Sequence, residues 1–166
     1  MTIDVRPVRP DEMEEAGRVT ALAYREFATP GDPDWDTYLS RIADVGERHG
    51  RTCVLVAVEA GRVFGSVTLE LDGRTEPDEE DRPLAPDEAH VRMLGVHPEH
   101  RRRGIARRLM DACMDEARKA GRTRLTLNTT QRMQAAQRMY EALGFRRTPD
   151  RVFPDGFVLL GYERRI

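Results

Sequence analysis

A short stretch at residues 96–110, VHPEHRRRGIARRLM, joins residue types that suit a bound phosphate. Gly104 has no side chain to block a close approach to the backbone, and Ala106 keeps the next contact small. If a helix begins at this glycine, its first backbone N–H groups have no partner within the helix, and its dipole favours an anion. Four cationic side chains add charge for a polyanion: Arg101, Arg102, Arg103 and Arg107. The alternative interpretation is a charged helix start whose glycine serves backbone geometry alone.

The pattern of apolar residues predicts a mixed α/β domain that holds this stretch between a strand and a helix. Alternating or β-rich runs predict about seven strands, at residues 3–9, 52–59, 62–71, 89–96, 124–128, 145–148 and 157–163. Helical spacing predicts about four helices, at residues 13–27, 35–45, 105–120 and 133–143. Ala60-Gly61 marks a hairpin turn. Residues 72–88 hold eight acidic side chains, two arginines and three prolines, which predicts a loop.

Length and composition narrow the classes of function. The 166 residues suit a single domain spanning 1–166, with 39% hydrophobic and 34% charged residues. The formal net charge of −2 argues against a nucleic-acid binder, whose domain charge is usually clearly basic. No segment approaches the roughly 20 apolar residues of a membrane helix, and residues 1–15 lack the apolar run of a signal peptide. We therefore expect a cytoplasmic protein with no membrane partner. Cys53 and Cys113 are expected to be buried, reduced thiols, and no Cys/His spacing predicts a metal site.

Two motifs resemble those of a known family. The segment RRRGIA at residues 101–106 is similar to the R/Q-x-x-G-x-G/A loop of GNAT-type N-acetyltransferases, which holds the pyrophosphate of coenzyme A. A second signature of that family, a tyrosine four residues before Gly-Phe, is matched by Tyr140 and the pair at 144–145. The predicted order of elements is also similar along nearly the whole chain. The resemblance implies a GNAT fold with a central twisted mixed sheet, in which the fourth and fifth strands splay apart to admit the pantetheine of acetyl-CoA.

The resemblance also implies contacts with acetyl-CoA at matching positions. They are Leu94, Gly95 and Val96 on the fourth strand, and Arg101, Arg102, Arg103, Gly104, Ile105, Ala106 and Arg107 in the loop. The N–H of Leu94 would face the thioester carbonyl as a backbone oxyanion hole, and a glycine at 95 fits a bulge or a close backbone approach. The family often has an asparagine where this chain has Met133, so that role is not transferred. Asn128 is the substitute polar contact, and no metal is implied.

A base is needed because an amine acceptor arrives mostly as ammonium. His90 lies at the start of the fourth strand, where several members of the family place a Glu or His base, and imidazole exchanges a proton near pH 7. In a regularly alternating strand His90 and Leu94 share one face, so both would look toward one cleft. Glu88 and Glu70 are alternative bases that would act through water. A surface position at the strand's edge is the competing interpretation for His90, and we expect His97 and His100 to be solvated loop residues.

By the same resemblance Tyr140 is the general acid for the leaving thiolate, with a core aromatic position as the alternative. The implied function is direct transfer of an acetyl group from acetyl-CoA to the primary amine of a small molecule or peptide. A non-catalytic acyl-CoA-binding or regulatory module on the same fold is the alternative, and no nucleic-acid partner is expected. The acidic loop at residues 72–88 would favour a cationic acceptor, and the alternative is a solvated connection that its charges keep soluble. The sequence leaves open the acceptor's identity, a homodimer and whether the acyl group is strictly acetyl.

Overall fold

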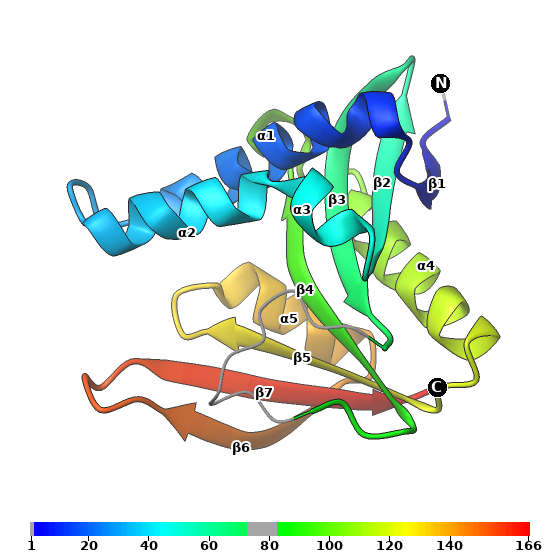
Figure 1. The fold of residues 1–166 in the computed structure, drawn as a ribbon. Helices are drawn as coiled ribbons and strands as arrows, with labels where there is room; N and C mark the ends of the chain where they lie inside the picture. Colours follow the sequence, from blue (N-terminus) through cyan, green and yellow to red (C-terminus); the bar gives the residue numbers. More distant parts are fainter. Residues whose placement is uncertain (1, 73–82) are drawn as a thin grey trace.

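The computed structural model describes residues 2–72 and 83–166 and has a mixed α/β fold (Figure 1). Within this part of the chain seven strands form one sheet: β1 (Asp4–Pro7), β2 (Cys53–Glu59), β3 (Arg62–Glu70), β4 (Glu88–Val96), β5 (Arg124–Thr130), β6 (Arg146–Val152) and β7 (Val158–Arg165). The same residues hold five α-helices: α1 (Met13–Tyr24), α2 (Pro33–Ala43), α3 (Val45–His49), α4 (Ile105–Lys119) and α5 (Gln134–Ala142). The predicted fold class and the seven strands are confirmed.

The helix predicted at residues 35–45 is α2, which ends at Ala43, and the short α3 that follows it was not predicted. Asp44 leaves helical geometry at φ −86° and ψ 72°, and its side chain accepts a hydrogen bond from the N–H of Glu47 as the cap of α3. α2 also starts earlier than predicted, since Asp32 caps it by accepting from the N–H of Asp34. The described residues therefore hold five helices where about four were predicted.

The sheet order is β1-β2-β3-β4-β5-β7-β6, and every neighbouring pair is antiparallel except β4 and β5. Parallel neighbours need a crossover connection, which α4 supplies. β2 and β3 form the predicted hairpin. Its turn residues Ala60 and Gly61 have φ angles of 50° and 74°, and two positive φ angles in succession match a type I′ turn.

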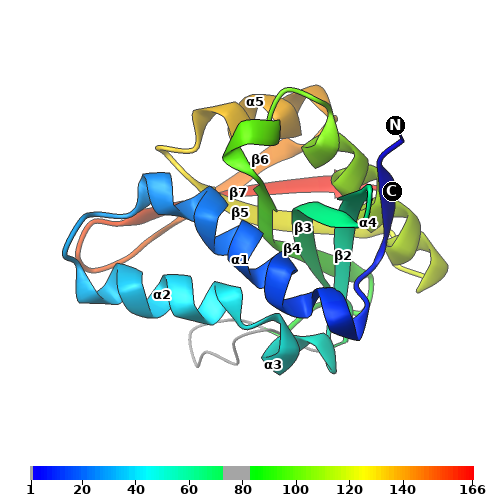
Figure 2. The ribbon, with the colours of Figure 1, turned by 90° about the horizontal axis from the view of Figure 1, so that it is seen from above.

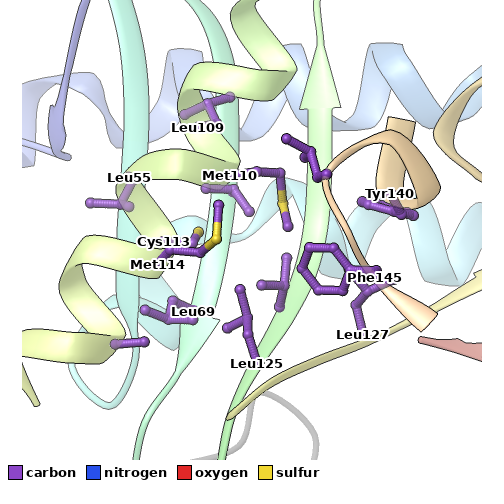
Figure 3. Close-up of a cluster of buried hydrophobic side chains, with 14 of the residues drawn as sticks. Leu55, Leu69, Leu109, Met110, Cys113, Met114, Leu125, Leu127, Tyr140 and Phe145 are labelled. Atoms are coloured by element: carbon purple, nitrogen blue, oxygen red, sulfur yellow. The ribbon is translucent and has the colours of Figure 1, made fainter. Parts of the chain in front are cut away.

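Helices cover both faces of the sheet. α1, α2 and α3 lie across one face, and α4 and α5 lie against the other (Figures 1 and 2). The face under α4 holds the largest apolar cluster (Figure 3). α4 contributes to it at the predicted spacing: Ile105, Leu109, Cys113 and Ala117. The face under α1 holds two smaller clusters, one of which joins Met93 of β4 to Ala21 and Ile42.

A bulge interrupts β4 in the middle of the strand. Its pairing with β3 shifts register between Ser66 and Thr68, so Met93 and Leu94 together oppose the single residue Val67. Met93 has a φ of 55°, which is uncommon for a residue other than glycine and matches the extra residue of a bulge. The strand therefore changes which face its side chains meet at this point.

The bulge overturns one prediction about the site. Met93 packs with the cluster under α1, whereas Leu94 packs against the cluster under α4, as Val91 does. Unbroken alternation would have placed Val91 and Met93 together and Leu94 on the opposite face with His90. The expectation that His90 and Leu94 share one face is therefore wrong, because alternation does not continue through a bulge.

β4 and β5 separate after a short shared ladder. The ladder has four pairs, from Glu88 opposite Arg124 to Val91 opposite Leu127. Beyond it, β4 stays with β3 and β5 stays with β7. Figure 1 shows the two strands leaving each other at a wide angle. The predicted splayed pair is confirmed, and it opens the gap around which the site is built.

α1 and α2 make a close backbone contact at Gly17, where a Cβ atom would lie 1.9 Å from the carbonyl oxygen of Ala43. We expect Gly17→Ala to lower the free energy of unfolding by about 1–3 kcal/mol, because one helix would have to move. Gly50→Ala is the matched control: at φ −70° its Cβ meets no atom within 4 Å, so stability should rise by about 0.4–1 kcal/mol. Urea denaturation measures both, and equal stabilities would contradict the close packing.

Most of the predicted acidic loop, residues 73–82, lies outside the described residues, so the structure does not test that prediction. Among the residues that are described, no helix combines the length and the apolar character needed to cross a bilayer.

Candidate active site

A cavity of about 720 Å³, here named cavity A, lies where the end of β4, the start of α4 and α5 meet. All the residues that the sequence assigned to the cofactor line it, with the exception of Arg103: Leu94, Gly95, Val96, Arg101, Arg102, Gly104, Ile105, Ala106, Arg107 and Asn128. The structure therefore brings the β4 residues and the loop residues together around one hollow.

The start of α4 forms one wall of cavity A. Gly104 has a φ of 74°, which favours glycine, and a Cβ atom built there meets no atom within 4 Å. The N–H of Arg108 bonds to the carbonyl of Gly104 at 3.1 Å, which begins the helical ladder. The N–H groups of residues 105–107 therefore have no acceptor within the helix, and these residues line the cavity. An anion is the ligand that such a helix end binds.

The arginines of the loop point in two directions. Arg103 donates hydrogen bonds to both carboxylate oxygens of Glu59, at 2.9 and 3.0 Å, and the structure does not bring it into cavity A. Arg101 lines the cavity and pairs with Glu26 at 2.5 Å. Two exposed arginines also line it: Arg102 and Arg107. The predicted cationic loop is therefore present without Arg103, which its partner on β2 holds elsewhere.

The turn before this loop groups His97, Glu99 and His100, whose ligand atoms lie within 4.8 Å of one another. The Nδ1 of His97 accepts from the N–H of Glu99 at 3.2 Å, and the Nδ1 of His100 lies 3.2 Å from an Arg103 nitrogen, which can only donate. In neutral rings the protons then sit on Nε2, so these rings are not arranged to bind a metal. Both histidines are half-buried rather than solvated, and His100 packs on Phe64 with ring centroids 3.9 Å apart.

A second cavity of about 540 Å³, here named cavity B, lies between α2, β4, β5 and the loop that joins β6 to β7. It shares four lining residues with cavity A: Tyr24, Asn128, Thr129 and Met133. Asn128 and Thr129 are the first β5 residues beyond the ladder with β4. The two cavities therefore meet at the gap between these strands, and Met133, where the family pattern expects asparagine, stands at the meeting point.

His90 lines cavity B, with 5% of its surface exposed. Its Nδ1 lies 2.7 Å from the hydroxyl of Thr126. The alternative bases, Glu88 and Glu70, are fully buried, and in the described part of the chain neither lines cavity A or cavity B. Glu70 instead lies 3.4 Å from the guanidinium of Arg92. Of the three candidate bases, His90 is therefore the one that stands at a cavity wall.

Tyr140 lines cavity A from α5. Its ring is buried in the apolar cluster that also holds Phe145 (Figure 3). The ring centroid lies 5.9 Å from those of Phe145 and Tyr162. Burial raises the pKa of Tyr140 above the ordinary value of a tyrosine, so the hydroxyl keeps its proton at neutral pH. The ring thus belongs to the core while the residue also borders the cavity, and the two interpretations of Tyr140 do not exclude each other.

Sequence reasoning missed the segment at residues 23–27, which lines cavity A at the end of α1. The guanidinium of Arg132 donates to the carbonyl of Phe27 at 3.0 Å, which ties this segment to the turn after β5. Tyr24 and Phe27, two aromatic residues about one helical turn apart, come just before the turn-rich residues 29–36. That pair at a helix end was the available signal.

Cys53 and Cys113 are free thiols, Cys53 half-buried and Cys113 fully buried. Burial raises the pKa of both thiols. Because the thiolate is the nucleophilic form, this environment disfavours attack by either sulfur. Among the described residues neither cysteine lines cavity A or B, so the arrangement does not favour a covalent cysteine intermediate.

Solved structures share this fold. PaiA N-acetyltransferase from Thermoplasma acidophilum, in complex with coenzyme A, is 14% identical, with a TM-score of 0.75 over 100% of both chains. The putative acetyltransferase yncA from Salmonella typhimurium, with its cofactor acetyl-CoA, is 21% identical, with a TM-score of 0.67 over 99% of this chain and 94% of that one. The ribosomal-protein-S18-alanine N-acetyltransferase from Escherichia coli is 20% identical, with a TM-score of 0.69 over the same shares, 99% and 94%. Likeness at these identities shows the fold alone.

The family is shown by a broader match along the sequence. No curated protein matches the chain. A model of the acetyltransferase (GNAT) family matches residues 18–145, which include the loop before α4 and the Tyr140 signature. The match covers well over half of the 166 residues and agrees with the splayed sheet and the placement of cavity A. The chain therefore belongs to the acetyltransferase (GNAT) family.

Proposed function

We propose that the protein is an N-acetyltransferase that moves an acetyl group from acetyl-CoA directly to a primary amine. The observation that carries this proposal is the meeting of cavities A and B at the gap between β4 and β5, with Tyr140 lining the first and His90 the second. A donor in cavity A and an amine in cavity B would meet there without an enzyme nucleophile. Membership of the GNAT family supports acyl transfer.

Acetyl-CoA suits cavity A by its chemistry. Its pyrophosphate would bind the free N–H groups at the start of α4, with Arg101, Arg102 and Arg107 nearby. The amides of its pantetheine arm would pair with the backbone of residues 94–96, which β5 has left. The N–H of Leu94 would then stabilise the thioester oxygen as negative charge develops on it, since a backbone dipole held in place needs no reorganisation.

Proton transfers complete the proposed reaction. A lysine-like ammonium has a pKa near 10.4, so the acceptor must lose a proton before it attacks. His90 would take that proton in cavity B, and the amine nitrogen would then form its bond to the thioester carbon as the carbon–sulfur bond breaks. The hydroxyl of Tyr140, which is protonated at neutral pH, would donate its proton to the departing sulfur. The second proton of the new amide nitrogen would then pass to the Tyr140 oxygen, because burial disfavours a lasting tyrosinate, and His90 would release its own proton to solvent. Positioned transfers of this kind typically contribute about 10²- to 10⁴-fold to a rate.

The walls of cavity B favour a cationic amine with an apolar body. Among the described residues, three carboxylates line it: Asp32, Asp34 and Asp155. Its arginines are engaged, since Arg92 lies 3.4 Å from Glu70 and Arg151 stands 4.7 Å over the ring of Phe153. Carboxylates at a cleft raise the local concentration of a cation, and aromatic walls hold both an apolar body and an ammonium group. We therefore place arylalkylamines and similar cations first among the acceptors.

The function predicts release of the coenzyme A thiol that depends on an added amine. A matched set of acceptors is 2-phenylethylamine, phenylalaninamide and phenylalanine, which share a ring and carry beside the amine a hydrogen, a neutral amide and a carboxylate, respectively. The amino acid should be the poorest by at least about tenfold, because its carboxylate would meet the carboxylates of cavity B. If no amine promotes thiol release while calorimetry shows acetyl-CoA binding, the enzyme proposal fails and a non-catalytic acyl-CoA-binding module takes its place.

A further inference from the structure

The ring of His90 ends a line of three buried side chains that runs between β4 and β5. Its Nδ1 lies 2.7 Å from Oγ1 of Thr126, and the Thr126 hydroxyl donates to Oε2 of Glu88 at 2.6 Å. His90 and Thr126 are partners in the parallel ladder, one pair before it ends. The line therefore lies beside the point where the strands separate, and it ends at the wall of cavity B.

Glu88 sets the direction of the hydrogen bonds along this line. Its Oε1 accepts from the N–H of Ala85 at 3.1 Å and lies 3.9 Å from the guanidinium of Arg124. Both contacts favour the charged carboxylate, which can only accept. Thr126 has one proton and gives it to Glu88, so its oxygen must accept from the ring of His90. The ring proton then lies on Nδ1.

A competing acceptor for the Thr126 proton is present and is weaker. The carbonyl oxygen of Ala89 lies 3.5 Å from Oγ1, at the limit of a hydrogen bond, whereas the Glu88 oxygen lies at 2.6 Å and carries charge. The Thr126 proton therefore goes to Glu88, and the Thr126 oxygen remains the acceptor for the ring of His90.

We propose that Thr126 and Glu88 are positioning residues that hold His90 in its Nδ1-protonated form, which leaves the lone pair on Nε2 as the base of cavity B. The inference rests on the proposed function and adds two residues to it. A neutral imidazole has two forms, and with Nδ1 turned to Thr126 only this form can accept a proton from an amine in the cavity. When the amine N–H bond breaks, the new bond forms at Nε2 and Nδ1 keeps its proton. The imidazolium is then stabilised through Thr126 by the Glu88 carboxylate.

The ring nitrogens of His90 test this directly and without turnover. Long-range ¹H–¹⁵N spectra of the full chain, with His90 assigned by comparison with His90→Gln, should show a protonated Nδ1 and an unprotonated Nε2 when the ring is neutral. Thr126→Val keeps the side-chain shape without the hydroxyl and should lose this preference, whereas Thr126→Ser should keep it. A neutral ring protonated at Nε2 in the wild type would overturn the proposal, and so would an unchanged pattern in Thr126→Val.

Kinetics with an active amine give the second readout. Thr126→Val should lower kcat by about tenfold or more with the KM for acetyl-CoA unchanged, because the base loses its fixed form, and Thr126→Ser should restore kcat. Equal kcat in Thr126→Val and wild type would overturn the positioning role. Should Thr126→Val fail to fold, the wild-type spectrum and Thr126→Ser still decide. An inactive protein with Nδ1-protonated His90 would refute the proposed function alone, and an active protein with Nε2-protonated His90 would refute this inference alone.

Discussion

Tyr140→Phe should lower turnover by about 10²- to 10⁴-fold while leaving the KM for acetyl-CoA nearly unchanged. The substitution keeps the ring that packs beside Phe145 and removes only the hydroxyl. In the proposed reaction that hydroxyl protonates the departing sulfur, so its loss is felt in the transition state and lowers kcat without weakening ground-state binding. Steady-state thiol release with a saturating amine measures the effect.

Tyr162→Phe is the matched control for this variant. The ring centroid of Tyr162 lies 5.9 Å from that of Tyr140 in the same core, and its hydroxyl donates to Glu141 at 3.0 Å. Tyr162 does not line cavity A or B among the described residues. Its substitution should cost about 1–2 kcal/mol of stability and leave kcat within about twofold of the wild type. A near wild-type kcat for Tyr140→Phe would leave packing as its only role, with water as the proton source.

Gly104→Glu should weaken acetyl-CoA binding by about a hundredfold or more. The new side chain would extend into cavity A, where the structure shows open space, and would place a negative charge where the pyrophosphate is proposed to bind. Placing like charges together costs several kcal/mol, and each 1.4 kcal/mol is about tenfold in affinity. Acetyl-CoA at about 100 times its dissociation constant should stabilise the wild type by roughly 2.7 kcal/mol, or about 5–10 °C in Tm. That shift should vanish in the variant.

Gly61→Glu separates this effect from backbone strain. Gly61 has the same φ as Gly104, 74°, and a built Cβ there also meets no atom within 4 Å, but the residue lies in the turn between β2 and β3 and outside the lining of both cavities. Both variants should lose about 1–2 kcal/mol to the left-handed conformation. Only Gly104→Glu should lose the thermal shift with acetyl-CoA. A full shift in Gly104→Glu would remove the start of α4 from the proposed donor site.

The features that the sequence predicted well depend on neighbours along the chain. The loop before α4 combines a glycine with a helix start, and both show in the six residues 101–106. The buried stripe of α4 follows from helical spacing, and the hairpin at Ala60-Gly61 follows from turn preferences. These patterns need no knowledge of which segments meet in space, so the sequence predicted most of the residues that β4 and the loop before α4 contribute to the lining of cavity A.

The features around cavity B and the position of Arg103 depend on contacts between distant segments, which the sequence does not display. The bulge at Met93 is a change of register between β3 and β4, and the alternation of residues within β4 alone does not reveal it. The side chain of Arg103 does not line cavity A because it donates a hydrogen bond to Glu59, which lies 44 positions earlier in the chain. The alignment of Glu88, Thr126 and His90 needs the parallel pairing of two strands that are joined through α4. In each case the residue types could be read from the sequence, but the segment or side chain with which they pair could not.

The separation of β4 and β5 also limits which amino-acid substitutions this protein can accept. Beyond the fourth pair the two strands forgo hydrogen bonds that a continuous sheet would make, each with a net contribution of about 0.5–1.5 kcal/mol. Substitutions that drew the strands together would strengthen the sheet and close the place where cavities A and B meet. A more stable sheet and the proposed catalysis therefore make opposite demands on this part of the fold. The pantetheine arm of the proposed donor would make the backbone hydrogen bonds to β4 that β5 does not make there. If β5 made those hydrogen bonds, the donor would have no place to bind.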